Sequence, residues 1–330
     1  MKETLLCCRI TAQEKGLYRL CHDGVEQAAQ VSGKFQYEAL GPSDYPTVGD
    51  EVLADLNGGG QAVIHKVLPR KSLFLRKAAG TAREEQPVAA NVDILFLCMA
   101  LNNDFNLRRL ERYLAAAWNS GATPVVVLTK ADLCGNPSEK VAAVEEAAPG
   151  TDVLLTSAAQ EDGIRPLLPY LTPGRTVAFV GSSGVGKSTL MNGLLGKEIL
   201  ATGGLRNDDR GRHTTTRRQM FFLPGGAALI DTPGMRELGL WDSESGLETA
   251  FADIEALARQ CRFQDCRHEK EPGCAVRAAL ASGELSEERF RSWQRLSAEN
   301  RYADDRAAHM SAKEKKFRMI AQFNKSHSKR

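Results

Sequence analysis

The middle of the chain carries a glycine-rich segment whose residue types and spacing suit phosphate binding. An apolar run at residues 176–180 precedes it and a helical pattern at 187–195 follows it, which is the context that the pattern GxxxxGKS requires. Glycines let the backbone curl so that amides point at phosphate oxygens, a lysine reaches the β and γ phosphates, and the Ser188 hydroxyl can bind Mg²⁺. The predicted nucleotide-binding residues here are Gly181, Ser182, Ser183, Gly184, Val185, Gly186, Lys187, Ser188 and Thr189.

A second segment with phosphate chemistry follows the apolar stretch 227–230. It comprises Asp231, Thr232, Pro233 and Gly234. The carboxylate of Asp231 stands at the end of a predicted strand, where it can reach the magnesium ion, often through water. The amide of Gly234 can then sense the γ-phosphate. Many turns share this tetrapeptide, but its place after a phosphate-binding loop favours a nucleotide-dependent switch.

Two further strand ends carry residues suited to a guanine base. They are Thr129, Lys130 and Asp132 at the end of the run 124–129, and Ser157 and Ala158 after the run 152–156. An aspartate carboxylate accepts hydrogen bonds from both N1–H and the exocyclic amine of guanine, a pair that adenine lacks, so such a site should reject ATP. Lys130 can pack its stem on the base, and the pair after 152–156 can offer an amide to the guanine carbonyl. Each signal is weak alone, because a strand-end aspartate is often only a helix cap.

A cluster of metal-ligand residues follows near the C-terminus. Cys261, Cys266, His268 and Cys274 provide three thiolates and one imidazole within fourteen residues, a full tetrahedral set for one Zn²⁺. A closed Cys₃His shell is structural, and it would hold together a loop-rich segment with little core of its own. The other cysteines lack such spacing and are interpreted as ordinary thiols: Cys7, Cys8, Cys21, Cys98 and Cys134.

The elements that must position these residues fall into an α/β pattern. Near-continuous apolar strands at 94–101, 124–129, 152–156 and 176–180 alternate with helices at 107–119, 138–148 and 163–171, which predicts a three-layer domain with a parallel sheet. The guanine-type segments precede the phosphate-type segments, although in most GTPases they follow them. The pattern therefore predicts a circularly permuted P-loop GTPase domain, which is possible when the ordinary termini lie close together.

Regions of different character flank this domain. Short β-rich stretches at 17–21, 34–39, 51–55 and 62–68, with a hairpin turn at 57–60, predict an OB-fold-like barrel. The predicted division is a barrel at 1–70, a basic linker at 71–85, the permuted domain at 86–242, and a zinc-binding helical module with a basic tail at 243–330, with helices at 247–260 and 286–306.

Composition narrows the class of protein further. With 330 residues, 42% hydrophobic and 25% charged, the chain is long enough for two or three folded domains. The longest apolar run, 94–101, is too short to span a bilayer, and no signal peptide is evident, so we expect a cytoplasmic protein without a membrane partner. Residues 311–330 hold seven Lys and Arg against one acidic residue, which makes RNA the first anionic partner to test.

Taken together, these features resemble the family of circularly permuted small-ribosomal-subunit GTPases called RsgA or YjeQ, over nearly the whole chain. The resemblance also includes Val48, Gly49 and Asp50, then Asn91, Val92 and Asp93, and the stretch Gly211, Arg212, His213, Thr214, Thr215 and Thr216. It implies a factor that acts late in maturation of the small (30S) subunit, binds 16S rRNA and is released on GTP hydrolysis. It also implies one structural Zn²⁺, Mg²⁺ with GTP, and a monomer.

Two residues depart from the usual GTPase pattern. Thr129 stands where Asn is commonest, which removes one base contact but is compatible with this family. Met235 follows Gly234 where many GTPases place a water-orienting Gln, so slow intrinsic hydrolysis is expected. His213 is the candidate catalytic group, the alternative being an exposed loop histidine. One of Thr214, Thr215 and Thr216 should complete the Mg²⁺ shell, and the arginines between 206 and 218 form a solvated or an RNA-contacting face.

Other function classes stay open on the sequence. A permuted GTPase for large-subunit assembly is disfavoured by the barrel and the zinc module. A P-loop ATPase or small-molecule kinase would be separated by nucleotide competition. A non-catalytic RNA-binding adaptor with a vestigial site is disfavoured by the intact Lys187, Ser188 and Asp231.

Overall fold

The fold is known from a computed structural model of the chain. It describes residues 5–14, 16–56, 60–77, 85–102, 104–160, 162–200, 218–231, 244–299 and 301. The chain divides into two compact units, residues 1–239 (unit 1) and 240–330 (unit 2), and each is described by itself. Among the described residues, no helix is both long and apolar enough to cross a bilayer.

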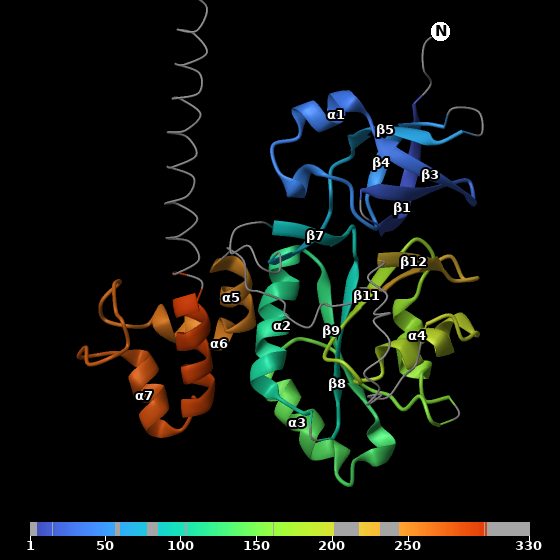
Figure 1. Cartoon of the computed structure of the whole chain (residues 1–330). Helices are drawn as coiled ribbons and strands as arrows, with labels where there is room; N and C mark the ends of the chain where they lie inside the picture. Colours follow the sequence, from blue (N-terminus) through green and yellow to red (C-terminus); the bar gives the residue numbers. More distant parts are fainter. Residues whose placement is uncertain are drawn as a thin grey trace, which may run out of the picture. The chain divides into compact units, whose positions relative to one another are not determined.

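Unit 1 begins with a small closed barrel (Figure 1, blue). Its strands follow the order β1-β2-β3-β5-β4, and β1 also pairs with β4, so the sheet closes on itself. The strands are β1 (Leu6–Glu14), β2 (Leu17–His22), β3 (Val25–Val31), β4 (Glu51–Asp55) and β5 (Ala62–Val67). Alternate side chains such as Ile10, Leu20 and Ile64 fill its core. The predicted OB-like barrel is therefore confirmed.

One predicted strand of the barrel is wrong. Residues 34–39 lie largely in a helix, α1 (Gly33–Glu38), which connects β3 to a 3₁₀ turn, η1 (Pro42–Asp44), and then β4. The Ser32 hydroxyl accepts a hydrogen bond from the Phe35 amide at 3.1 Å, so a cap residue starts a helix in a segment rich in aromatic residues. Strands β1 and β3 were not predicted. Residues 57–59 of the predicted hairpin turn lie outside the described residues, although β4 and β5 pair antiparallel around them.

The predicted linker also differs from the structure. Strand β6 (Leu73–Lys77) lies inside residues 71–85 and pairs antiparallel with β7 (Glu85–Ala90). Phe74 and Val88, one on each strand, are almost fully buried, so apolar packing orders a segment whose basic residues resemble a loop in the sequence. Residues 78–84 lie outside the described part.

The second part of unit 1 is a parallel sheet with helices on both faces. Its strand order is β10-β9-β8-β11-β13-β12, and all neighbours are parallel except β12 and β13. The strands are β8 (Ile94–Ala100), β9 (Thr123–Thr129), β10 (Val153–Leu155), β11 (Thr176–Val180), β12 (Arg218–Phe222) and β13 (Ala228–Asp231). The helices are α2 (Leu107–Ser120), α3 (Pro137–Ala147) and α4 (Lys187–Leu195), with 3₁₀ turns η3 (Ala131–Leu133) and η4 (Arg165–Tyr170).

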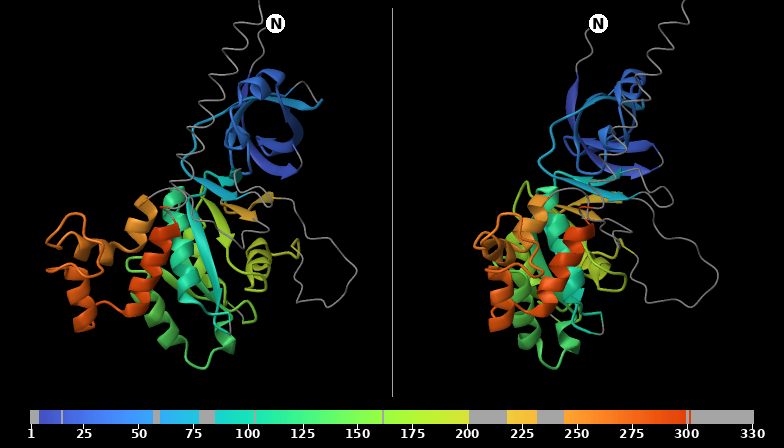
Figure 2. Two further views of the ribbon diagram at one scale, coloured as in Figure 1. Left: turned by 60° about the vertical axis from the view of Figure 1, so that its left-hand side comes forward. Right: turned by 90° about the vertical axis from the view of Figure 1, so that its left-hand side faces the viewer.

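Helices α2 and α3 lie on one face of this sheet and α4 on the other (Figures 1 and 2). On the α4 face, Leu190 and Met191 pack against Phe96, Phe179 and neighbouring strand residues. The segment predicted as a helix at 163–171 is instead the shorter 3₁₀ turn η4. Its two prolines, Pro166 and Pro169, lack the amide donors that an α-helix would use.

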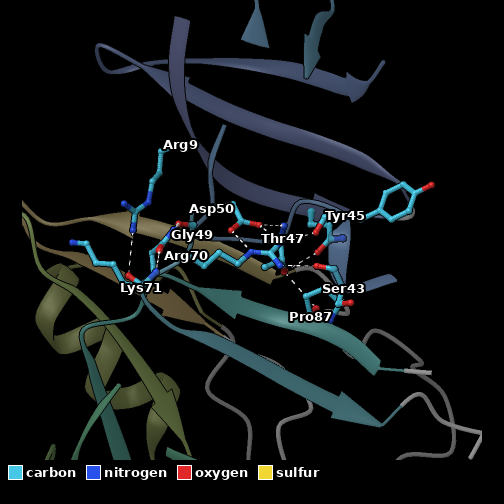
Figure 3. Close-up of polar contacts among 11 residues, drawn as sticks. Arg9, Ser43, Tyr45, Thr47, Gly49, Asp50, Arg70, Lys71 and Pro87 are labelled. Atoms are coloured by element: carbon cyan, nitrogen blue, oxygen red, sulfur yellow. Dashed lines mark hydrogen bonds and ion pairs between the residues drawn. The ribbon is translucent and has the colours of Figure 1, made fainter. Parts of the chain in front are cut away.

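The barrel and the parallel sheet are joined by direct pairing and by polar contacts. We call this region, together with the Arg70–Asp50 pair on its barrel side, the junction. Strand β1 pairs antiparallel with β12, so the barrel and the parallel sheet form one continuous sheet. In the junction, Arg70 donates to both carboxylate oxygens of the fully buried Asp50, at 2.7 and 2.8 Å, and to the carbonyls of Ser43 and Tyr45 (Figure 3). The side-chain amide of Asn91 donates to the Gly49 carbonyl at 3.0 Å.

Unit 2 is helical. Its described helices are α5 (Glu244–Ala250), α6 (Ala252–Ala258), α7 (Ala275–Ser282) and a helix over residues 287–299. The single helix predicted at 247–260 is broken at Phe251, whose backbone leaves the helical region (φ −121°, ψ 39°). The Phe251 ring is fully buried, with the Arg289 guanidinium 4.8 Å from its centroid, so core packing outweighs helix continuity. The last part of the helix predicted at 286–306 lies outside the described residues.

Candidate nucleotide and metal sites

The phosphate-binding loop joins β11 to α4, as the sequence predicts. Gly181, Gly184 and Gly186 all have positive φ angles, a conformation that other residues rarely adopt. A Cβ atom at Gly181 would lie 2.3 Å from the Cys98 carbonyl oxygen, so only glycine fits against β8. The Lys187 ammonium donates to the carbonyls of Gly181 and Ser182 at 2.6 and 2.7 Å, which places its charge inside the loop.

Asp231 ends β13 beside this loop. Burial raises the pKa of its carboxyl above the ordinary value, and the positive charge of Lys187 partly opposes the rise. This carboxylate is largely removed from water and close to the phosphate-binding lysine. It is therefore suited to bind a magnesium ion that is held with phosphates. The donor set of Asp231 and Ser188 fits Mg²⁺, which prefers oxygen ligands.

The predicted guanine-type residues are brought together at the ends of β9 and β10. The Ser157 hydroxyl donates to the Asp132 carboxylate, and the Ser157 amide donates to the Gly163 carbonyl at 3.1 Å. A Cβ atom at Gly163 would lie only 1.8 Å from the Ser157 carbonyl oxygen, so this glycine shapes the loop. Gly163 was not predicted as a site residue, since nothing in its spacing distinguishes it from an ordinary turn glycine.

Thr129 has a contact that sequence reasoning missed. Its hydroxyl donates to the Val185 carbonyl of the phosphate-binding loop at 2.6 Å, across 56 residues of sequence. The threonine that replaces the usual asparagine therefore links the guanine-type strand end to the phosphate-binding loop. Its type alone could not reveal this link, because the link depends on β9 and β11 sharing one sheet edge.

The four predicted zinc ligands come together in unit 2. The ligand atoms of Cys261, Cys266, His268 and Cys274 all lie within 4.8 Å of one another. The Sγ atoms of Cys261 and Cys274 are 3.8 Å apart, and His268 Nδ1 is 3.6 and 3.4 Å from them. Tetrahedral zinc with its usual bond lengths requires about 3.8 Å between two sulfurs and about 3.6 Å between sulfur and nitrogen. The residues present therefore fit Zn²⁺, with Nδ1 as the imidazole ligand.

The surroundings of this cluster suit a metal centre. Burial lowers the pKa of His268, which favours the neutral ring that binds metals. The His268 ring packs on Trp293, with the centroids 5.6 Å apart. Glu271 accepts hydrogen bonds from the amides of Arg267, Glu269 and Lys270. Hydrogen bonding to its own backbone amide, and then to these three amides, lowers the pKa of Glu271 to about 2. The carboxylate thus orders the loop between the second and fourth ligands.

Several predicted site residues lie outside the described part of the chain. They are Gly234 and Met235 after β13, and His213, Thr214, Thr215 and Thr216 before β12. The described part of the chain resumes after them at Arg218, the first residue of β12.

The parallel sheet, the phosphate-binding loop and the reversed order of its strand-end motifs define a circularly permuted P-loop GTPase. The sequence model of the RsgA GTPase family matches residues 67–241, more than half of the chain. The chain belongs to this family. A model of the ABC transporter family also matches, at residues 166–328, a range that contains the phosphate-binding loop shared by many P-loop proteins.

Relatives and solved structures agree with this family. The chain is 50% identical to "Small ribosomal subunit biogenesis GTPase RsgA 2" of Lactiplantibacillus plantarum, over 89% of this chain and 83% of that protein. It is 45% identical to the RsgA protein of Methanosarcina acetivorans, over 93% and 82%. The crystal structure of YjeQ from Thermotoga maritima matches with a TM-score of 0.67 and 27% identity, over 89% of this chain and 97% of that one. That of YloQ, a circularly permuted GTPase, matches in fold at 23% identity, with a TM-score of 0.64 over 92% and 96%.

Proposed function

We propose that this GTPase acts in late maturation of the small (30S) ribosomal subunit, that it binds 16S rRNA, and that GTP hydrolysis releases it. The observation that carries the proposal is the 50% identity, over 89% of this chain, with a relative named a small ribosomal subunit biogenesis GTPase. The basic residues at 311–330 add a segment suited to the phosphate backbone of RNA. We further propose that the protein is monomeric and cytoplasmic.

In the proposed site, the amides of residues 181–189 cradle the phosphates and Lys187 moves from its carbonyl partners to the β and γ phosphates. Asp132 accepts from the guanine edge, with Lys130 against the base and the amides near Ser157 and Ala158 on its carbonyl. Ser188, Asp231 and one of Thr214, Thr215 and Thr216 would hold a Mg²⁺ ion with GTP, and this ion would neutralise phosphate charge. Gly234 senses the γ-phosphate.

Catalysis is proposed to depend on the ribosomal subunit. Met235 cannot orient water, so the free protein should hydrolyse GTP slowly. His213 precedes β12, whose first residue contacts the barrel through Gln13 at 3.3 Å. When the protein is bound to the subunit, His213 orients or deprotonates the attacking water.

The remaining parts would supply binding and stability. We propose the barrel at 1–70 and the zinc module at 243–330, which precede and follow the GTPase domain at 86–242 in the sequence, as RNA-contacting parts. One Zn²⁺, held by Cys261, Cys266, His268 and Cys274, would be structural because its shell has no open position. It would stabilise the fold of unit 2 rather than take part in hydrolysis.

The test is GTP turnover by the purified protein alone, with purified small subunits, and with large subunits as the matched control. We expect strong stimulation by small subunits only, weakening as salt rises, and loss of most stimulation in His213→Ala with GTP and subunit binding retained. Stimulation by large subunits would support the large-subunit alternative. ATP competing as well as GDP would support an ATPase or kinase and contradict the guanine assignment.

A further inference from the structure

The loop between β8 and α2 lies beside the phosphate-binding loop, at the point where the connections of the sheet diverge. Strand β8 continues through α2 to β9 on one side, and its parallel neighbour β11 continues through α4 on the other side. Ligands of open α/β sheets bind in the crevice outside the strand ends at such a point. Asp104, which lies in this connection, is therefore close to the expected ligand position at the strand ends.

Asp104 contacts the phosphate-binding loop directly. The Ser182 hydroxyl donates a hydrogen bond to the Asp104 carboxylate. The guanidinium of Arg109, in the first turn of α2, lies 2.9 Å from the other Asp104 oxygen and also donates to the Asp104 carbonyl. The Asn106 side chain caps α2 by accepting a hydrogen bond from the Arg109 amide at 3.0 Å. This cap fixes the start of the helix and therefore the position of Arg109.

Ser182 is thus held from two sides. Its carbonyl accepts from Lys187 at 2.7 Å and its hydroxyl donates to Asp104. Because Lys187 must turn to the phosphates when a nucleotide binds, its bond to Ser182 competes with the ligand. The hydrogen bond to Asp104 does not compete with the nucleotide, so it can hold the phosphate-binding loop in place both with and without a bound nucleotide. A loop fixed in advance pays less ordering entropy on binding.

A bare carboxylate at this position would oppose an anionic ligand. Coulomb repulsion between Asp104 and the phosphates would weaken binding, but Arg109 places a positive charge against Asp104. Both side chains are about one-third exposed, so salt should modulate the charge term.

We propose that Asp104 is a positioning residue for nucleotide binding. It anchors the phosphate-binding loop through the Ser182 hydroxyl, and Arg109 cancels its charge so that phosphates are not repelled. The inference deepens the proposed function, since it rests on nucleotide binding by the phosphate-binding loop.

The anchor is tested by titrating a fluorescent derivative of GDP into the full chain and three variants: Ser182→Ala, Asp104→Ala and the two changes combined. In the native background, Ser182→Ala should weaken binding about ten-fold, the value of one hydrogen bond to a charged group. In the Asp104→Ala background, the same Ser182→Ala change should cost less than about two-fold, because its partner is gone. In subunit-stimulated turnover, Asp104→Ala should raise the KM for GTP about ten-fold and change the maximal rate by much less, since the anchor acts equally before and during the reaction. Equal losses in both backgrounds would overturn the anchor.

The charge role is tested with Arg109→Ala. This variant should bind the GDP derivative several-fold more weakly at low salt, the loss should shrink as potassium chloride is raised, and adding Asp104→Asn should restore binding. The matched control is Arg19→Ala, since Arg19 pairs with Glu26 at 3.3 Å on the barrel surface and should leave binding unchanged. A loss independent of salt and not rescued by Asp104→Asn would mean that Arg109 only supports α2, which contradicts the proposal. If the unmodified protein bound no guanine nucleotide, the proposed function itself would fail.

Discussion

Two arginine–aspartate pairs, one in each unit, differ in how far they are buried. In unit 1, Arg70 pairs with Asp50, whose carboxylate is fully buried, and also ties two loop carbonyls into the junction. In unit 2, Arg289 is the buried partner and Asp253 is 38% exposed. The first pair lies among strands with a large apolar core, whereas the second lies near a metal-ligand cluster. From this difference we predict that unit 1 depends mainly on packing and polar contacts, and that unit 2 depends more on the zinc proposed for its Cys₃His cluster.

The largest expected effect is therefore loss of zinc from unit 2. Structural zinc contributes about 10–16 kcal/mol of apparent binding free energy in small metal-dependent folds, more than any side-chain contact in unit 1. Cys266→Ala should abolish the one equivalent of bound zinc and unfold unit 2, while GDP binding by unit 1 persists. Metal analysis, circular dichroism and nucleotide titration measure the three quantities.

Cys7→Ala is the control for this change, because Cys7 is an exposed thiol outside the cluster. It should leave zinc content and both units unchanged. If freshly purified protein held no zinc, or if Cys266→Ala melted like the unmodified chain, the assignment of unit 2 stability to metal would be wrong.

The next effect should come from the junction. Arg70→Ala leaves the carboxylate of Asp50 buried and, among the described residues, with the Thr47 amide at 2.8 Å as its remaining donor. Removing one partner of a buried pair costs about 3–5 kcal/mol, and we expect that loss in the urea unfolding of unit 1. Arg19→Ala, which breaks an exposed pair with Glu26, should cost less than about 1 kcal/mol. Similar losses in the two variants would show that the junction is no stronger than a surface contact.

Gly49→Ala probes the packing of the same junction. Gly49 has φ +93°, and a Cβ atom there would lie 2.1 Å from the Ala90 carbonyl oxygen and 3.2 Å from Ile230 Cδ1. Strain and overpacking together should cost about 3 kcal/mol. The control is Gly24→Ala, where φ is +80° but nothing lies within 4 Å, so only the backbone term of about 1 kcal/mol remains. An equal loss at both positions would remove the steric argument.

The sites that could be predicted from the sequence are those whose functional residues lie close together in the chain. Residues 181–188 and the Cys₃His set have fixed spacing, because neighbouring backbone atoms must surround one phosphate or one metal ion. The apolar strands of the parallel sheet were predictable because both faces are buried. Contacts between distant residues were not, since Ser182 and Asp104 are 78 residues apart and meet only through the sheet order.

Local errors in the prediction also have physical causes. Residues 34–39 include aromatic residues that favour strands, but the Ser32 cap starts a helix there. Phe251 interrupts a helical pattern because its ring enters the core. Arg70 stands just before the predicted linker, and its role appears only when Asp50 is brought beside it.

The smallest expected effect returns to the second arginine–aspartate pair. Asp253→Asn keeps a hydrogen-bond acceptor for Arg289, which also donates to the Ala250 carbonyl at 3.1 Å and packs on Phe251. Since Asp253 is partly exposed, solvent screens the pair, and zinc-loaded unit 2 should lose only about 1 kcal/mol in thermal unfolding. A loss as large as that of Arg70→Ala would contradict the contrast between the units.

The pH dependence of this loss has a definite sign. Burial alone would raise the pKa of Asp253, but the hydrogen bonds and charge of Arg289 outweigh it and lower the pKa overall. A carboxyl with a lowered folded pKa stabilises the fold above its unfolded pKa of about 3.9, and this stabilisation is lost as pH falls through the folded value. The difference between Asp253→Asn and the unmodified chain should therefore be equal at pH 6 and pH 8, where zinc is retained. A difference that grew or vanished between these values would mean that the pair is coupled to the metal ligands, and that unit 2 has no contact network independent of its zinc.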